Sequence, residues 1–314
     1  MSGISVREEA PSPLYKFVPN PRFLENSLFR FSQPGALNDP EEALPRVTFG
    51  LYAAEDYAEA RNMAERAGFV GLPADKLETL FMDPYPKDRF DESSFPCLWP
   101  ATVPELRPEP FESLEDFDRS VMDRAVLLCR QSANRELGIF SLTESTHDSM
   151  WAYYAADHTG MAVEFDAYHP FFSDNQSLFQ VKYSDEPVFV SSNGGVIRVA
   201  GEKFEVRSIL SGDLNTIPLE LLVRKRLGWQ HEREWRLITK LSEANEISAQ
   251  DRDFPIYLFE VPPDSIAAII FGLRADQNLI RHVADCAENE PKWSHLALRK
   301  RVQSPRGEAL EKCW

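Results

Sequence analysis

The sequence predicts an α+β fold in which mixed or antiparallel central β-sheets form a cleft. Three observations predict it. Short apolar, β-prone runs recur along the chain, segments with apolar residues every three or four positions lie between them, and one proline-rich stretch interrupts the pattern. The chain has 314 residues, 43% of them hydrophobic, so it can bury a large core. We expect a single domain over residues 1–314.

The expected elements follow one another along the chain. After a proline-rich start, residues 13–18 have the pattern of a strand, and residues 28–31 form a second strand that ends at the turn residues Pro34 and Gly35. Residues 112–134 predict a long helix, because their apolar positions recur every three or four residues. The remaining expected strands are 138–142, 160–165, 179–183, 235–239, 256–261, 267–271 and an edge strand at 295–298, and the remaining helices are 148–158, 218–227 and 276–287.

An insertion is expected between the second strand and the long helix. Asn38 to Glu41 has the residues of a helix start, residues 53–67 form a polar helix rich in Ala and Glu, and residues 83–110 hold so many prolines that we expect a long loop. We therefore place the core in about 12–40 and 135–300, a helical and proline-rich insertion in about 41–134, and a short C-terminal tail in 301–314.

Charge and composition limit the classes of function. The formal net charge of -16 disfavours broad binding to nucleic acid or an anionic membrane. The four cysteines are far apart, the six histidines lack metal-site spacing, and no run of about 18 apolar residues occurs. We expect a cytoplasmic protein with no metal and no membrane partner. Rossmann dehydrogenases, P-loop enzymes and α/β-hydrolases are excluded, because their glycine loops and nucleophile elbow are missing.

The segment W-Q-H-E-R-E-W-R-L-I-T-K, from Trp229 to Lys240, is the first candidate for a site. As a strand it places Glu232, Glu234 and Arg236 on one face, because side chains alternate with a period of two. The two acids would lie roughly 7 Å apart along the strand. Since they repel each other, at least one needs a cation such as Arg236 or Lys225. A surface strand with cross-strand ion pairs explains the same residues.

The segment from Asp148 to His158 is the second candidate. At helical spacing, these two residues share a face with Trp151 and Tyr154. Aromatic residues with polar tips suit a pocket that stacks a flat ligand and hydrogen-bonds its edge. They are also common core residues of a helix, so a structural role explains them equally.

Several motifs together resemble a bacterial family of unknown function. The motifs are L-Y-K-F at 14–17, L-N-D-P-E at 37–41, S-L-T-E at 141–144, M-W-A-Y-Y-A-A-D-H-T-G at 150–160, V-E-F at 163–165 and K-x-x-x-W-x-x-E-x-E-W-R at 225–236. The family is the domain-of-unknown-function family 2971, DUF2971. A toxin or phage-defence role in bacteria would fit a family of this kind.

The same motifs show a weaker similarity to the ADP-ribosyltransferase-like fold. Proteins of that fold carry a nicotinamide-site residue on a first strand, a hydroxyl residue on a second strand that leads into an aromatic-bearing helix, and the catalytic glutamate on a later strand. The resemblance implies that Glu234 and Glu232 are catalytic. It implies that the residues binding the cofactor are Tyr15, Lys16, Ser141, Trp151, Tyr154 and Arg236. Lys16 departs from the pattern, since those proteins usually have a histidine or an arginine there.

The resemblance implies NAD as a co-substrate, with a small nucleotide as partner and an acceptor, protein or nucleic acid, that stays open. Cleavage of an N-glycosidic bond passes through an oxocarbenium-like state, which a carboxylate stabilises. We expect this role for Glu234, and for Glu232 the orientation or deprotonation of the acceptor. The alternative is a module without catalysis that binds a nucleotide or a protein in the same cleft. A metal-dependent nuclease is a third option, but the sequence has no clear acid cluster.

Overall fold

The computed structural model of the protein describes residues 11–39, 46–50, 114–173, 178–193, 196–205, 208–209, 216–251, 254–304 and 307–313. The chain divides into two compact units. Unit 1 comprises Met1–Ala43, Asn134–Asp185 and Val223–Trp314, and unit 2 comprises Leu44–Ala133 and Glu186–Leu222. The expected insertion at about 41–134 therefore falls largely in unit 2, which also takes in a second segment that the sequence assigns to the core.

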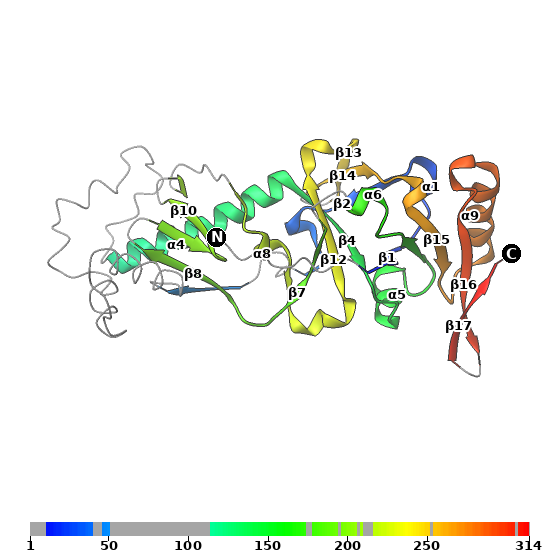
Figure 1. The fold of residues 1–314 in the computed structure, drawn as a ribbon, viewed down its shortest axis with the longest axis horizontal. Helices are drawn as coiled ribbons and strands as arrows, with labels where there is room; N and C mark the ends of the chain where they lie inside the picture. Colours follow the sequence, from blue (N-terminus) through cyan, green and yellow to red (C-terminus); the bar gives the residue numbers. More distant parts are fainter. Residues whose placement is uncertain are drawn as a thin grey trace. The chain divides into compact units, whose positions relative to one another are not determined.

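Unit 1 is built on an eight-stranded mixed sheet (Figure 1). Its strands, in spatial order, are β17 (Gly307–Lys312), β16 (Ala297–Ser304), β15 (Ile266–Phe271), β5 (Met161–Phe165), β1 (Leu14–Val18), β4 (Leu137–Thr143), β12 (Glu234–Lys240) and β6 (Leu178–Gln180). Neighbouring strands are antiparallel except β15 and β16, which are parallel. The predicted α+β class with mixed and antiparallel sheets is confirmed.

The main core of unit 1 lies between this sheet, a second sheet and a helix. The second sheet is antiparallel and consists of β13 (Glu246–Asp251), β14 (Phe254–Glu260) and β2 (Leu28–Phe31). Phe31 of β2 stacks on Phe140 of β4, with ring centroids 4.8 Å apart. The helix α9 (Gln277–Asn289) lies beside β16 in Figure 1 and buries Val283 in the same cluster as Leu298 of β16. Aromatic and aliphatic burial thus joins β2, which comes early in the chain, to elements near its end.

The other elements of unit 1 are short. They are α1 (Phe23–Asn26), η1 (Pro34–Ala36), α5 (Asp148–Tyr154), α6 (Pro170–Ser173), the parallel pair β7 (Lys182–Tyr183) and β11 (Arg224–Lys225), and the 3-10 helices η4 (Leu227–Glu232), η5 (Leu241–Glu243), η6 (Pro263–Ser265) and η7 (Pro291–Trp293).

Unit 2 has its own core. A four-stranded sheet contains β10 (Glu202–Glu205), β9 (Val196–Val199), β8 (Val188–Asn193) and β3 (Val47–Gly50), of which β3 and β8 are parallel. The long helix α4 (Leu114–Glu136) and the short α8 (Leu219–Leu222) contribute to the same cluster through Ala125, Leu128 and Leu221. The predicted helix at 112–134 is confirmed, whereas the expected helix at 53–67 and loop at 83–110 lie outside the described residues.

Several boundaries differ from the sequence prediction. The expected helix at 148–158 ends at Tyr154, because the next turn contains three residues with positive φ, Ala156, Asp157 and His158. The amide of Asp157 donates to the main-chain oxygen of Ala152 and that of His158 to Trp151, and the chain then turns directly into β5. The expected helix at 218–227 is only α8 followed by β11 and the start of η4. The expected edge strand at 295–298 is β16, an inner strand, because the predicted tail forms β17 beside it.

The close approach of β15 to the turn after α5 generates a stability prediction. A Cβ atom on Gly272 would stand 2.1 Å from the carbonyl oxygen of His158. We expect Gly272→Ala to lower the free energy of unfolding by about 1–3 kcal/mol, because the main chain has to move. Urea unfolding followed by circular dichroism measures the change. The control is Gly228→Ala, where nothing lies within 4 Å of an added Cβ. Equal losses in the two variants would contradict the explanation.

Candidate functional site

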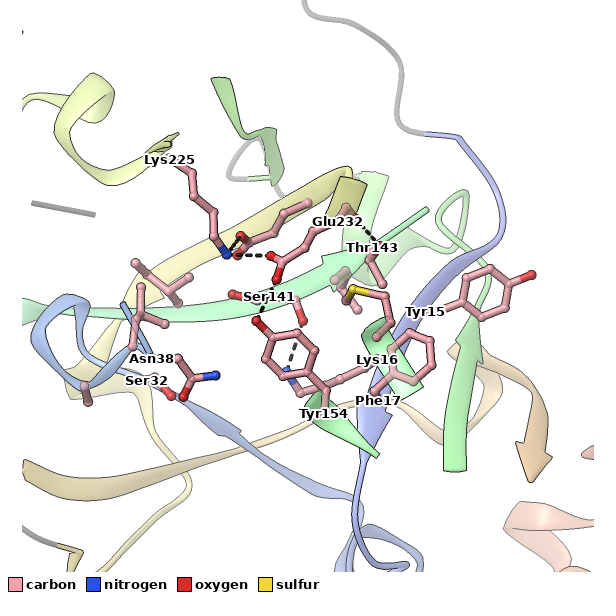
Figure 2. A pocket seen from close by; sticks show the side chains of 16 residues that line it. Tyr15, Lys16, Phe17, Ser32, Asn38, Ser141, Thr143, Tyr154, Lys225 and Glu232 are labelled. Carbon is pink, nitrogen blue, oxygen red and sulfur yellow. Dashed lines mark hydrogen bonds and ion pairs between the residues drawn. The ribbon is translucent and has the colours of Figure 1, made fainter. Parts of the chain in front are cut away.

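The candidate site is a pocket of unit 1 at the place where β1 and β4 stop pairing. The register joins these strands at Tyr15 and Thr143, whereas β4 pairs with β12 along its whole length. The cavity measures about 180 Å³, less than the ~300 to 1,000 Å³ of pockets that enclose a drug-sized ligand. Its lining comes from β1, β4, α5, β11, η4 and β12 and from the segment that follows β2 and includes η1. The lining residues, drawn in Figure 2, are Tyr15, Lys16, Phe17, Ser32, Ala36, Leu37, Asn38, Ile139, Ser141, Leu142, Thr143, Met150, Tyr154, Lys225, Glu232 and Glu234.

Lys225 holds two carboxylates together in the pocket wall. Its Nζ lies 2.5 Å from Oε2 of Glu232 and 3.0 Å from Oε2 of Glu234. Figure 2 shows the lysine side chain extending from β11 to the carboxylate of Glu232. All three side chains are between 3% and 5% exposed. Buried charges of this kind are tolerated only when they are paired and hydrogen-bonded, so the three groups depend on one another.

Arg236 neutralises Glu234 from the same face of β12. Its Nε donates to Oε1 of Glu234 at 2.9 Å, and its Nη2 donates to Oε2 at 3.1 Å. Burial raises the pKa of Glu234, but the charges of Arg236 and Lys225 outweigh that effect and hold the pKa at about 2. Glu234 is therefore ionised at neutral pH. The expectation that Glu234 and Arg236 share a strand face is confirmed.

Glu232 reaches the site from a different element than the sequence predicts. It ends the 3-10 helix η4, and the next residue, Arg233, has a left-handed backbone with φ 45° and ψ 53°. The prediction that Glu232 lies on the strand is therefore wrong, because the chain reverses at Arg233 and β12 begins only at Glu234. The reversal lets the carboxylates of Glu232 and Glu234 bind the same ammonium group. Tyr154 Oη donates to Oε1 of Glu232 at 2.7 Å, and Thr143 Oγ1 donates to the main-chain oxygen of Glu232.

Lys16 bridges the gap between β1 and β4. Its ammonium group donates to the main-chain oxygen of Ser141 at 3.0 Å and lies 4.3 Å from the centre of the Phe140 ring. Burial lowers the pKa of Lys16 to about 8, against the opposing effect of Glu234. The side chain thus supplies a hydrogen bond where the β1–β4 pairing has ended, and it places a positive charge on the pocket wall.

The structure brings most of the predicted site residues together. Those that line the pocket are Tyr15, Lys16, Ser141, Tyr154, Glu232 and Glu234. The other two do not line it: Arg236 is fully buried behind Glu234, and Trp151 is buried under Phe17 and the guanidinium group of Arg301. The ring centroids of Trp151 and Phe17 are 4.9 Å apart, which is the contact of a core residue.

Sequence analysis missed part of the site. It named Lys225 only as a partner for one of the acids, and the structure shows that this lysine joins both. Tyr183 was not considered, although its hydroxyl accepts the main-chain N–H of Glu234 at 2.8 Å. Thr143 stands in the S-L-T-E motif, which was a usable signal for its position in the site. Nothing in the sequence around Tyr183 indicates its position beside β12.

Two further properties concern the described residues as a whole. In the part of the chain that the structure describes, no three His, Cys, Asp or Glu side chains come together as metal ligands would. None of the helices in those same ranges combines the length and apolar character needed to cross a membrane.

Fold and site together define an α+β protein with a buried charge network in the wall of a pocket. Residues 150–237 match the model of a family described as "Protein of unknown function (DUF2971)". The match confirms the DUF2971 resemblance over the segment that carries Tyr154, Lys225, Glu232 and Glu234. No curated protein and no solved structure matches the chain.

Removal of the shared cation is the first test of the network. We expect Lys225→Met to lower the free energy of unfolding by about 3–5 kcal/mol, because two buried carboxylates lose their common partner. Lys292→Met is a matched control, since both lysines pair with a glutamate and both Nζ atoms lie 5.3 Å from a Trp ring centre, but Lys292 is 35% exposed. The control should cost no more than about 1 kcal/mol in urea unfolding. A similar loss in both variants would argue against a buried network.

The pKa of Glu234 predicts how stability depends on acid. The pKa of Glu234 is about 2 in the folded protein and 4.5 for an ordinary glutamate, which represents the unfolded chain. At pH values between about 2 and 4.5 the unfolded chain therefore binds more protons than the folded protein. The free energy of unfolding should therefore fall as the pH drops from about 5 to about 2, by an amount on the order of 3 kcal/mol. Chemical unfolding at a series of pH values measures this, and Glu234→Gln should show a flatter profile. An equal slope in that variant would contradict the assignment.

Proposed function

We propose that the pocket binds the nicotinamide ribose end of NAD and that the protein transfers or hydrolyses ADP-ribose. The observation that carries the proposal is the convergence of Lys16, Ser141, Tyr154 and Glu234 on one pocket of unit 1, although they come from β1, β4, α5 and β12. These positions correspond to those that the resemblance to ADP-ribosyltransferase-like proteins marks as the nicotinamide site, the hydroxyl residue, the helix aromatic and the catalytic glutamate. NAD is available in the cytoplasm, and a toxin or phage-defence role in bacteria fits the activity.

The ionised carboxylate of Glu234 matches the chemistry of NAD cleavage. When the bond between C1′ of the ribose and the nicotinamide nitrogen breaks, its electron pair leaves with nicotinamide, and positive charge develops on the ribose. A carboxylate with a pKa of about 2 stays negative and stabilises that charge. Arg236 and Lys225 hold the carboxylate in place, so it needs little reorganisation during the reaction.

Glu232 is placed to act as the base for the acceptor. Its two oxygens accept hydrogen bonds from Tyr154 and Lys225, and each carboxylate oxygen has a second lone pair. A water molecule or an acceptor hydroxyl forms the new bond to C1′ and gives its proton to Glu232. With water, the products are ADP-ribose, nicotinamide and one proton.

A second candidate is a module that binds the nucleotide without cleaving it. The observation that favours it is the double neutralisation of Glu234 by Arg236 and Lys225. Two adjacent cations reduce the negative potential that Glu234 presents to a cationic ribose. On this alternative the carboxylates shape the pocket and hold ligand hydroxyls, and nicotinamide is not released.

Nicotinamide release separates the two candidates. We expect the purified protein to release nicotinamide from NAD, Glu234→Gln to lower the rate by about 10² to 10³-fold, and Glu232→Gln to lower it by about 10²-fold. Chromatography of the products measures the rates, and circular dichroism verifies folding. The matched control is Glu164→Gln, a buried carboxylate of β5 that pairs with Arg299 and does not line the pocket.

The outcomes are distinct. Release that depends on Glu234 and not on Glu164 supports catalysis. Calorimetric binding of NAD without release supports the binding module. If the protein does not bind NAD and releases no nicotinamide from it, both candidates are overturned.

A further inference from the structure

One exposed and two half-buried aromatic residues stand next to the pocket, on the side of η4 and α5. We call Tyr153, Trp229 and His231 the aromatic rim. Tyr153 is 68% exposed and lies in α5 between Met150 and Tyr154, which line the pocket. The Nζ of Lys225 lies 5.3 Å from the ring centre of Trp229. The rim is thus continuous with the pocket wall. An exposed tyrosine that packs on a half-buried tryptophan leaves aromatic surface at which a ligand can be bound.

The rings of the aromatic rim meet at two different angles. The centroids of Tyr153 and Trp229 are 6.3 Å apart, with an angle of 68° between the ring planes. Trp229 and His231 are more nearly parallel, with centroids 6.2 Å apart and planes at 30°. A flat group can therefore stack on one ring while the edge of another contacts it.

Trp229 is held in a fixed position. Its Nε1 donates to Oδ2 of Asp39 at 3.1 Å, and Asp39 follows Asn38, which lines the pocket. A surface ring that is already ordered loses little entropy when a ligand binds. The rim therefore has the preorganisation expected of a binding surface.

Positively charged residues flank η4, the 3-10 helix that carries Trp229. Arg226 precedes η4 and Arg233 follows it, and both are exposed. In a chain of net charge -16 this local excess attracts a small anion such as a diphosphate rather than a long polyanion.

The size of the cavity connects the rim to a ligand. At about 180 Å³ the cavity accepts one ring with its sugar and leaves the rest of a dinucleotide outside. The part left outside has to lie on the adjoining surface, which carries the aromatic rim and the two arginines.

We propose that the aromatic rim binds the adenine end of the ligand, with the base stacked on Trp229 against Tyr153 and the diphosphate beside Arg226 and Arg233. This inference rests on the proposed function, because it assigns the second half of the dinucleotide to that site. A nucleobase of an acceptor is the competing occupant of the rim. The cavity volume favours adenine, because the cavity is too small for a whole dinucleotide and Trp229 adjoins its wall at Lys225.

Two half-ligands test the proposal by isothermal titration calorimetry. ADP-ribose carries the adenine end, and nicotinamide mononucleotide lacks it. We expect Trp229→Leu and Tyr153→Leu to weaken ADP-ribose binding roughly 10- to 100-fold, as loss of base stacking does, and to change nicotinamide mononucleotide binding by less than about twofold. Tyr168→Leu, at a tyrosine of unit 1 that is 60% exposed and outside the rim, should change neither. Tyr153 is the safer variant for folding, because its side chain is mostly in solvent.

The outcomes separate the inference from the function. Unchanged ADP-ribose binding in both rim variants, or equal weakening of both ligands, overturns the adenine site; in the first case an acceptor base becomes the occupant to test. ADP-ribose binding that depends on Trp229, in a protein that releases no nicotinamide from NAD, supports the adenine site and contradicts catalysis. A wild-type protein that binds neither half-ligand overturns both.

Discussion

The ammonium group of Lys225 is the interaction on which the candidate site depends. It lies between two carboxylates that are separated by one residue in the sequence, and all three groups are almost inaccessible to solvent. Without a cation at this point the carboxylates would repel each other, and one of them would take up a proton. Lys225 therefore fixes the position where η4 ends, where β12 begins and where the pocket has its charged wall.

The charges around the pocket suggest how binding and cleavage of NAD would be linked. The charges of the two glutamates cancel those of Lys225 and Arg236. Lys16 adds one positive charge, because its ammonium group has a pKa of about 8 and is mostly protonated at neutral pH. Under the proposed function, a cationic nicotinamide ring next to Lys16 is repelled, whereas the neutral nicotinamide that leaves is not. The lysine that departs from the usual pattern of the fold would then favour bond breaking at some cost in affinity.

Much of the fold follows from the sequence because its strands are marked by short runs rich in apolar and β-prone residues. β1, β4, β5, β12, β14 and β15 are of this kind, and the shared face of Glu234 and Arg236 follows from strand periodicity. The position of Glu232 does not follow, because a left-handed backbone at Arg233 has no sequence signal of the kind that glycine gives. The end of α5 was also missed, because it is set by the positive φ angles of the turn that follows it. The strand β17 was missed because it depends on main-chain pairing with β16.

The pairing of β2 with β14 has a consequence for synthesis of the chain. Phe31 pairs in register with Tyr257, so β2 is synthesised long before the partner strand that it needs. Until then, its phenylalanines and its unpaired edge are exposed to other chains, and such long-range pairing is slow to form. A chaperone that binds the emerging segment around β2 would therefore be expected to affect the yield of folded protein more than the stability of the finished fold.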